Sequence, residues 1–230
     1  MFSHFDLIYF LISMVVIVFA IGFHEFAHAK FADLAGDPTP RMMGRVTLNP
    51  LAHLDPIGTI MLVITSIAGI GIGWGKPVLV RPDKMRNPRW DHFLSVAAGP
   101  LSNLLQAAVY ALILRLMMVA NGAAAASVGA FLGHDLNNIF VIFLFTGVLI
   151  NLSLFAFNLI PLGPLDGHWL VGAFLPEPAR IRWYQFNRGI GGILFLILVF
   201  IPADSGFDLL GMFVGRIVLP LFRLLTGIHL

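Results

Sequence analysis

His24, Glu25 and His28 are the residues near the amino end whose types and spacing could do chemistry together. On a helix the two histidines lie one turn apart, so their imidazoles share one face and can bind a single metal ion. A carboxylate next to that face can take a proton from a water at the metal, as in the H-E-x-x-H arrangement of zinc hydrolases. The pattern therefore predicts one zinc ion per chain, held by His24 and His28, with Glu25 as the base.

The composition predicts an integral membrane protein. Hydrophobic residues make up 58% of the chain, charged residues make up 11%, and the mean hydropathy is +0.89. Soluble domains carry about a quarter charged residues. The absence of cysteine excludes disulfides and thiolate metal ligands. A formal charge of +2 is too small to indicate a nucleic-acid partner, and the partner that this composition implies is the lipid bilayer.

Apolar runs divide the chain into membrane segments. Three runs are each long enough to cross a bilayer, over 7–31, 93–114 and 139–160. One or two further membrane helices fit within 186–228. Lysine and arginine gather after the first and third runs, whereas the loop 121–138 carries neither and is expected outside. By the positive-inside rule, the carboxyl end of the first helix, and with it the histidine motif, is expected in the cytoplasmic half of the bilayer.

The segment 57–74 is also apolar, but the densest basic cluster of the chain follows it. The members of that cluster are Lys76, Arg81, Lys84, Arg86 and Arg89. A crossing would place these charges outside, so we expect 57–74 to dip into the membrane and return on the same side. Residues 76–81 could then form a short edge strand.

The predicted fold class is an all-α polytopic membrane protein. We expect about five or six transmembrane or re-entrant helices, together with a short membrane-associated β-hairpin. No linker is long enough to separate two domains, so one domain is expected over 1–230, with its catalytic core over 7–175.

A third metal ligand must ionise and lie at the same depth as the two histidines, because hydrolytic zinc sites have three protein ligands and an open position. Asp166 follows the inward-going run 139–160 and returns to the same half of the bilayer, and Gly167 permits a close backbone approach. Two alternatives stay open on the residues alone. Asp166 could cap the helix that follows it, or His168 could be the ligand in its place.

Three separate motifs resemble those of the site-2 protease family of intramembrane zinc metalloproteases. They are 24–28 (HEFAH), 98–103 (AGPLSN) and 158–167 (NLIPLGPLDG), in the order and the membrane settings of that family. The stretches 44–50 and 55–58 also resemble its short prokaryotic branch, which lacks an inserted PDZ-like domain. The resemblance implies that His24, His28 and Asp166 bind zinc and that Glu25 is the catalytic carboxylate.

The resemblance also assigns a site role to Asn103, the polar residue of the 98–103 motif. An asparagine facing the site could donate a hydrogen bond to the developing oxyanion or pin an unwound substrate backbone. The alternative is a hydrogen bond between helices.

These features predict a protease of the cell membrane that hydrolyses a peptide bond within or near a transmembrane segment of a membrane-protein substrate. A metal transporter or sensor would also explain the two histidines and Asp166, but it gives Glu25 no specific task. A catalytically inactive scaffold of the same fold is the third hypothesis, and the intact motif argues against it.

Two further polar residues carry weaker expectations. His53 is expected in an interfacial loop, with metal binding as its less favoured role. Asn158 lies in an apolar run, where an amide without a partner is costly, and it is expected to brace the turn towards Asp166.

Overall fold

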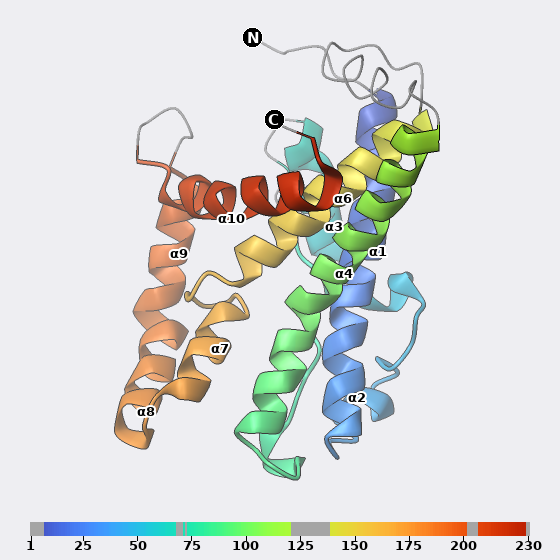
Figure 1. Ribbon diagram of the computed structural model, residues 1–230. Helices are drawn as coiled ribbons and strands as arrows, with labels where there is room; N and C mark the ends of the chain where they lie inside the picture. The colour runs from blue at the N-terminus through green and yellow to red at the C-terminus, as the bar shows by residue number, and fades with distance from the viewer. Residues whose placement is uncertain (1–6, 68–70, 72, 121–138, 202–206, 229–230) are drawn as a thin grey trace.

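The fold is built mainly from long helices. The computed structural model describes residues 7–67, 71, 73–120, 139–201 and 207–228, and the elements of this part are helical (Figure 1). Four helices are long and apolar enough to cross a membrane: α1 (Leu7–Leu34), α4 (Trp90–Ala120), α6 (Ile139–Asn158) and α10 (Leu209–Thr226). A helix pairs its backbone polar groups internally, as a hydrocarbon environment requires. The prediction of an all-α polytopic membrane protein is confirmed.

Shorter elements connect these helices. Between α1 and α4 lie α2 (Thr39–Met42), η1 (Pro50–His53), α3 (Pro56–Ile67) and η2 (Pro82–Lys84). Between α6 and α10 lie α7 (Gly167–Phe174), α8 (Glu177–Phe186), the π-helical turn η3 (Asn187–Gly191) and α9 (Gly192–Val199). The loop 121–138, predicted to be external, lies outside the described residues.

The core forms where α1, α4 and α6 pack together, with α10 against α6. Small residues of α4, Ala107 and Ala111, are buried against the large apolar side chains of α6. Small residues let helix backbones approach closely, which drives helix association in a membrane. Phe145 of α6 meets Phe222 of α10 with ring centroids 5.4 Å apart. Leu152 and Ala156, nearer the carboxyl end of α6, are buried in the same core. The loop that carries Asp166 starts after this end of the helix.

The apolar segment after η1 leaves the bundle and comes back to the same place. Leu54, just before α3, forms an antiparallel bridge with Gly75, and the Lys76 N–H donates to the His53 carbonyl at 2.8 Å. A segment whose ends meet cannot carry the chain across a membrane, so the re-entrant interpretation is supported. The expected strand over 76–81 does not form. These residues are extended, but within the described part of the chain no strand lies beside them to complete a ladder.

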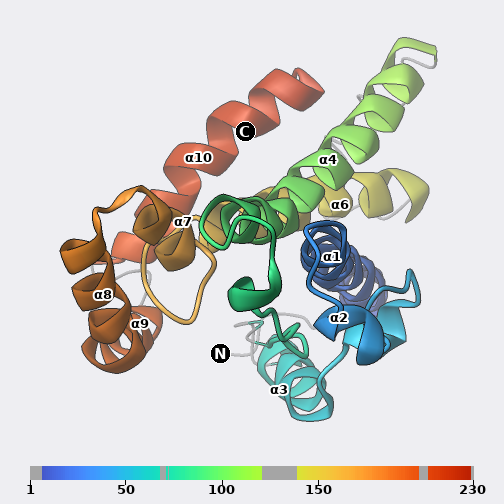
Figure 2. The same cartoon turned by 90° about the horizontal axis from the view of Figure 1, so that it is seen from below.

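The first helical rod of the carboxyl part is longer than its hydropathy alone suggests. In Figure 1 the helices α8 and α9 follow one another through η3, and Figure 2, seen from below, shows α8 lying over α9. This rod begins at Glu177, well before the apolar run 189–201 that predicts a membrane helix there. In Figure 1, α10 then lies across the bundle at a steep angle to α1.

Replacing Gly58 with alanine should loosen the re-entrant hairpin. A Cβ at Gly58 would fall 2.2 Å from the Trp74 carbonyl oxygen, which is backbone and cannot turn away. We expect Gly58→Ala to cost about 1–3 kcal/mol through this overpacking, measured as a lower thermal unfolding midpoint in detergent. Gly215→Ala is the matched control, because a Cβ there meets no atom within 4 Å. Equal midpoints for the two variants would contradict the close approach of α3 and Trp74.

Candidate metal centre

Three predicted ligands come together between α1 and the loop after α6. His24 and His28 lie on one face of α1, with their Nε2 atoms 3.0 Å apart. The Oδ2 atom of Asp166 lies 3.2 Å from His24 Nε2 and 3.3 Å from His28 Nε2. Among the described residues, these three form a group whose ligand atoms are close enough to hold one metal ion.

A tight loop brings Asp166 back to α1. A Cβ at Gly167 would lie 2.3 Å from the Ile160 carbonyl oxygen, so only glycine fits where the loop closes on itself. The Gly163 N–H donates to Asn187 Oδ1 at 2.7 Å, which ties the loop to η3. Asp166 does precede α7, but its side chain makes no capping hydrogen bond to that helix. The capping alternative is therefore not what the structure shows.

The tautomer of His28 follows from its partner. Its Nδ1 lies 2.8 Å from the Ser95 carbonyl oxygen, and a carbonyl can only accept, so Nδ1 carries the hydrogen. In return, the Ser95 hydroxyl donates to the His28 carbonyl at 3.0 Å. In the neutral ring, Nε2 is then left with a free lone pair, as a metal ligand needs.

His24 is oriented in the same way by Asn103. The Nδ2 group of Asn103 donates to the Ala20 carbonyl and to Asn151 Oδ1, both at 3.1 Å. Its Oδ1 therefore faces His24 Nδ1, at 2.6 Å, and accepts that hydrogen. Asn103 and Asn151 are both fully buried, so this network lies behind the imidazole, away from solvent. The His24 Nε2 lone pair is thereby turned towards His28 and Asp166.

The arrangement of these atoms fits a divalent cation. Asp166 Oδ2 is buried and, within the described part of the chain, accepts no hydrogen bond of good geometry. Two imidazole lone pairs and a carboxylate oxygen within 3.3 Å repel one another unless a positive charge lies among them. Ligands at 2.0–2.1 Å in a tetrahedron around zinc are about 3.3 Å apart, close to these separations.

Helix α4 approaches the two histidines at Gly99. A Cβ there would lie 2.3 Å from His28 Nε2 and 2.8 Å from His24 Nε2. Any larger residue would push α4 away from α1 or fill the space of the metal. This explains in physical terms why a glycine stands within the 98–103 motif.

Glu25 and the three ligands open onto one cavity of about 650 Å³. Apolar side chains of α1, α6 and α7 form much of its wall, including Ile21, Leu154, Phe157 and Trp169. On another side the cavity is bounded by the extended segment that follows the re-entrant hairpin. There the Val78 N–H donates to Glu25 Oε2 at 3.1 Å. The catalytic candidate thus faces the same space as the metal group.

The remaining predicted residues lie apart from the metal group. The ring of His168 bonds through Nδ1 to the Leu165 carbonyl, and the buried His53 bonds to the Thr47 carbonyl at 3.0 Å. Asn158 lines the cavity and donates to Leu154 of its own helix, so it does not brace the loop as expected. Asn187 braces the loop instead, through its bond to Gly163.

Sequence reasoning missed Ser95, Asn151 and the backbone of Val78. Asn151 carried a readable signal, because it is an amide inside the apolar run 139–160, as Asn158 is. Ser95 orients the His28 ring through its backbone carbonyl, which every residue possesses, and Val78 contacts Glu25 through its backbone N–H, which every residue except proline possesses. No pattern of residue types could have identified them.

Comparisons with known proteins identify a peptidase family and two named relatives. The chain matches the family described as Peptidase family M50 over residues 9–201, a range that includes all three ligands and Glu25. It is 35% identical over 192 residues to "Putative zinc metalloprotease YwhC" of Bacillus subtilis, covering 84% of this chain and 81% of that protein. It is 28% identical over 182 residues to "Putative zinc metalloprotease Rip2" of Mycolicibacterium smegmatis, covering 78% of this chain and 63% of that protein. No solved structure matches the chain.

Removing the carboxylate should release the metal. We expect Asp166→Ala to be purified with little bound metal, because two neutral imidazoles alone do not complete the site. His168→Ala should keep a full complement, since its ring bonds to Leu165 rather than joining the group. Elemental analysis of both purified variants makes the comparison. If the metal content fell in His168→Ala and persisted in Asp166→Ala, His168 and not Asp166 would be the third ligand.

Removing the Asn103 amide should weaken metal binding without destroying the site. Loss of a group that orients a ligating histidine costs about 10- to 100-fold in metal affinity, so we expect a shift of this size for Asn103→Ala in competition with a chelator. Asn158→Ala is the control, because that amide bonds within its own helix. An affinity equal to that of the wild type would show that Asn103 does not support His24.

Proposed function

The chain belongs to peptidase family M50 and is a zinc metalloendopeptidase, and we propose that it hydrolyses a peptide bond within or near a transmembrane segment of another membrane protein. One observation carries this proposal. The three ligands and Glu25 share a cavity that lies partway along helices long enough to cross a membrane. A metal transporter would leave Glu25 without a task at this position.

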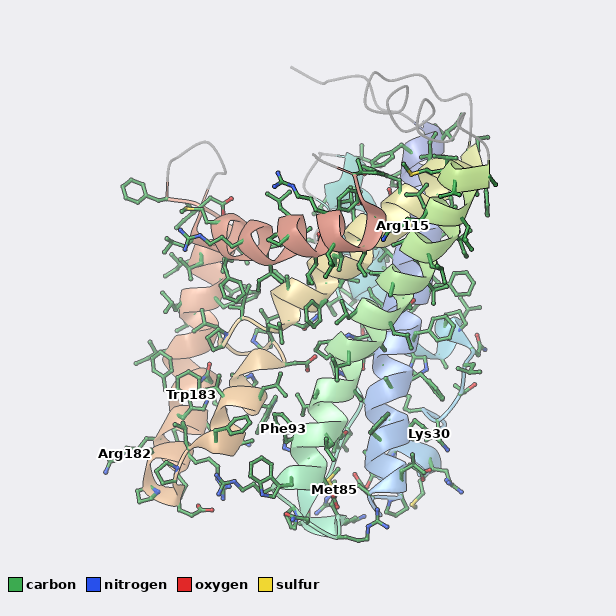
Figure 3. All side chains as sticks on the ribbon, viewed as in Figure 1. Lys30, Met85, Phe93, Arg115, Arg182 and Trp183 are labelled. Atoms are coloured by element: carbon green, nitrogen blue, oxygen red, sulfur yellow. The ribbon has the colours of Figure 1, made fainter. Side chains whose placement is uncertain are left out.

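The depth of the site supports cleavage inside the bilayer. His24 lies about 15 Å from the Leu34 end of α1, at the helical rise of 1.5 Å per residue. Figure 3 shows Lys30 and Arg182 towards the lower end of the molecule and Arg115 towards the other. The basic residues of α2 and η2 also belong to the end where α1 finishes. By the positive-inside rule this end is cytoplasmic, and we place the site in the cytoplasmic half of the cell membrane.

The residues of the site divide the proposed reaction among themselves. His24, His28 and Asp166 would hold the zinc ion. When bound, zinc supplies a water that ionises near neutral pH and a positive charge that polarises the substrate carbonyl. Glu25 accepts the proton of the attacking water and then donates it to the leaving amine. Because Oε2 of Glu25 already accepts the Val78 N–H, we assign the proton to the other carboxylate oxygen.

Asn103 is better explained as support for His24 than as an oxyanion donor. Both hydrogens of its amide already have acceptors, Ala20 and Asn151, and the side chain does not line the cavity. Donating to an oxyanion would require breaking this buried network. We therefore retain Asn103 as a positioning residue in the proposed mechanism.

The substrate class follows from the walls of the cavity. The apolar side chains of α1, α6 and α7 suit the residues of a transmembrane helix, and residues 77–80 present an extended backbone beside the metal group. A helical peptide bond is protected by its own hydrogen bonds, so a substrate must unwind locally before hydrolysis. An extended edge can hold the unwound chain by β-pairing.

Glu25→Gln should retain zinc and lose cleavage. Glutamine keeps the shape of the side chain but cannot take a proton, and general acid–base catalysis contributes about 10²- to 10⁴-fold in rate. We expect a fall of at least this size, measured by mass spectrometry of a model transmembrane peptide incubated with the full chain in detergent. Glu177→Gln is the matched control, because Glu177 pairs with Arg180 on α8, away from the cavity. Near-normal turnover by Glu25→Gln with zinc bound would contradict the proposed mechanism.

A further inference from the structure

An extended segment lies along the cavity between the re-entrant hairpin and η2. We name residues 74–81 the strap. Six of its residues line the cavity: Trp74, Gly75, Pro77, Val78, Leu79 and Val80. The strap rests closely on α1, because a Cβ at Gly75 would lie 2.6 Å from Ile21 Cγ2 and 3.6 Å from Glu25 Cγ. The turn of α1 that carries Glu25 is thus in direct contact with the strap.

The middle of the strap holds the carboxylate of Glu25. The Val78 N–H donates to Glu25 Oε2 at 3.1 Å, which restricts the rotation of a side chain that otherwise has three free torsions. The position of this backbone N–H depends on how the strap is fastened at its two ends. The amino end is fastened to η1, through the bridge of Gly75 with Leu54 and the bond from Lys76 to the His53 carbonyl.

The carboxyl end of the strap is fastened by Asp37, in the loop after α1. Asp37 is fully buried, and its Oδ2 accepts the Arg81 N–H at 2.6 Å. Its Oδ1 accepts the Thr39 N–H at 2.9 Å, so the same carboxylate also belongs to the start of α2. Burial alone would raise the pKa of Asp37, but its bonds to Thr39 and Arg81, with the charge of Lys84, lower it. An ionised acceptor makes the stronger kind of hydrogen bond.

Asp37 has no contact with the cavity and no task in the reaction as proposed so far. Val80, next to Arg81, packs against Ala32, Ala35 and Met85, so the end of the strap is seated on the last turns of α1. The Asp37–Arg81 bond is thus a direct link from the loop after α1 to the peptide backbone three residues beyond Val78.

We infer that Asp37 is a positioning residue for peptide-bond hydrolysis, which holds the strap so that the Val78 N–H fixes the carboxylate of Glu25. The inference rests on the proposed function, in which Glu25 moves the proton. Asp37 acts twice in this arrangement. It keeps the general base in a productive orientation, and it keeps the strap backbone extended beside the metal group, where an unwound substrate would pair.

The first test compares two aspartates near the end of α1. Asp37→Asn removes the charge and one of the two acceptor oxygens, and a misplaced catalytic group costs about 10- to 100-fold in rate. We expect kcat for a model transmembrane peptide to fall by this factor per zinc-loaded, folded molecule. Asp33→Asn is the matched control, because Asp33 pairs with the exposed Arg41 and does not contact the strap. Its kcat should stay near that of the wild type.

A second variant breaks the link further along. Val78→Pro removes the N–H that Glu25 accepts and leaves Asp37 with both of its partners. If both changes act through this one contact, the double variant Asp37→Asn, Val78→Pro should lose no more kcat than the more impaired single variant. If the two substitutions acted independently, the factors by which they lower kcat would multiply in the double variant.

The strap itself can be observed through a thiol. The chain contains no cysteine, so Val80→Cys provides a single label on a half-buried strap residue. We expect a water-soluble maleimide to react faster with this cysteine when Asp37→Asn is added, and at an unchanged rate when Asp33→Asn is added. Equal rates in all three backgrounds would overturn the fastening role.

The outcomes separate this inference from the proposed function. Full activity of zinc-loaded Glu25→Gln would defeat the proposed function and, with it, the inference. An inactive Glu25→Gln beside an Asp37→Asn variant with wild-type kcat would overturn the inference alone. A loss of activity in Asp37→Asn that only parallels lost zinc or lost folded protein would also overturn it, since that is what a purely structural aspartate would produce.

Discussion

The structure depends on the need to satisfy three buried acceptors at one point inside an apolar bundle. His24 and His28 each give their Nδ1 hydrogen to an acceptor of α4, which leaves both Nε2 lone pairs facing Asp166. In surroundings of low dielectric such a cluster is costly without a positive charge. The bonds from Asn103 and Ser95 therefore orient the ligands before any metal arrives. Metal binding and the packing of α1 against α4 are parts of the same arrangement.

The site also requires that backbone segments approach one another closely, and a glycine allows this at each of three contacts. Gly99 lets α4 reach the imidazoles, and Gly167 lets the loop after α6 fold back with Asp166. Gly75 lets the strap cross α1 beside Glu25. At each position a Cβ would meet an atom at 2.6 Å or less, far inside ordinary contact. Gly99 and Gly75 lie directly against α1, whereas Gly167 lets the loop close on its own backbone. Three segments that are distant in sequence can therefore converge on the same part of α1.

Residue types and charge patterns predicted the elements that depend on them. The histidine spacing predicted two ligands, the topology of 139–160 predicted Asp166 at the same depth, and the basic cluster after 57–74 predicted a segment that returns. The backbone contacts of the site could not be predicted from the sequence, because the Ser95 carbonyl and the Val78 N–H have no signature in residue types. The strand expected over 76–81 shows the same limit. Its residues are extended as predicted, but a strand also requires a neighbour, which residues 76–81 do not specify.

Among the described residues no strand lies beside residues 76–81, which gives a physical reason for the proposed hydrolysis at this depth. Unwinding a substrate helix in hydrocarbon exposes N–H and C=O groups, each of which costs several kcal/mol without a partner. In the proposed function, the strap offers its extended backbone to those groups next to the metal ligands. A complete hairpin would already have paired that backbone with its own chain. A segment that is held at its two ends, with no strand beside it in the described part of the chain, is therefore better suited to receive an unwound segment than the β-hairpin that the sequence predicted.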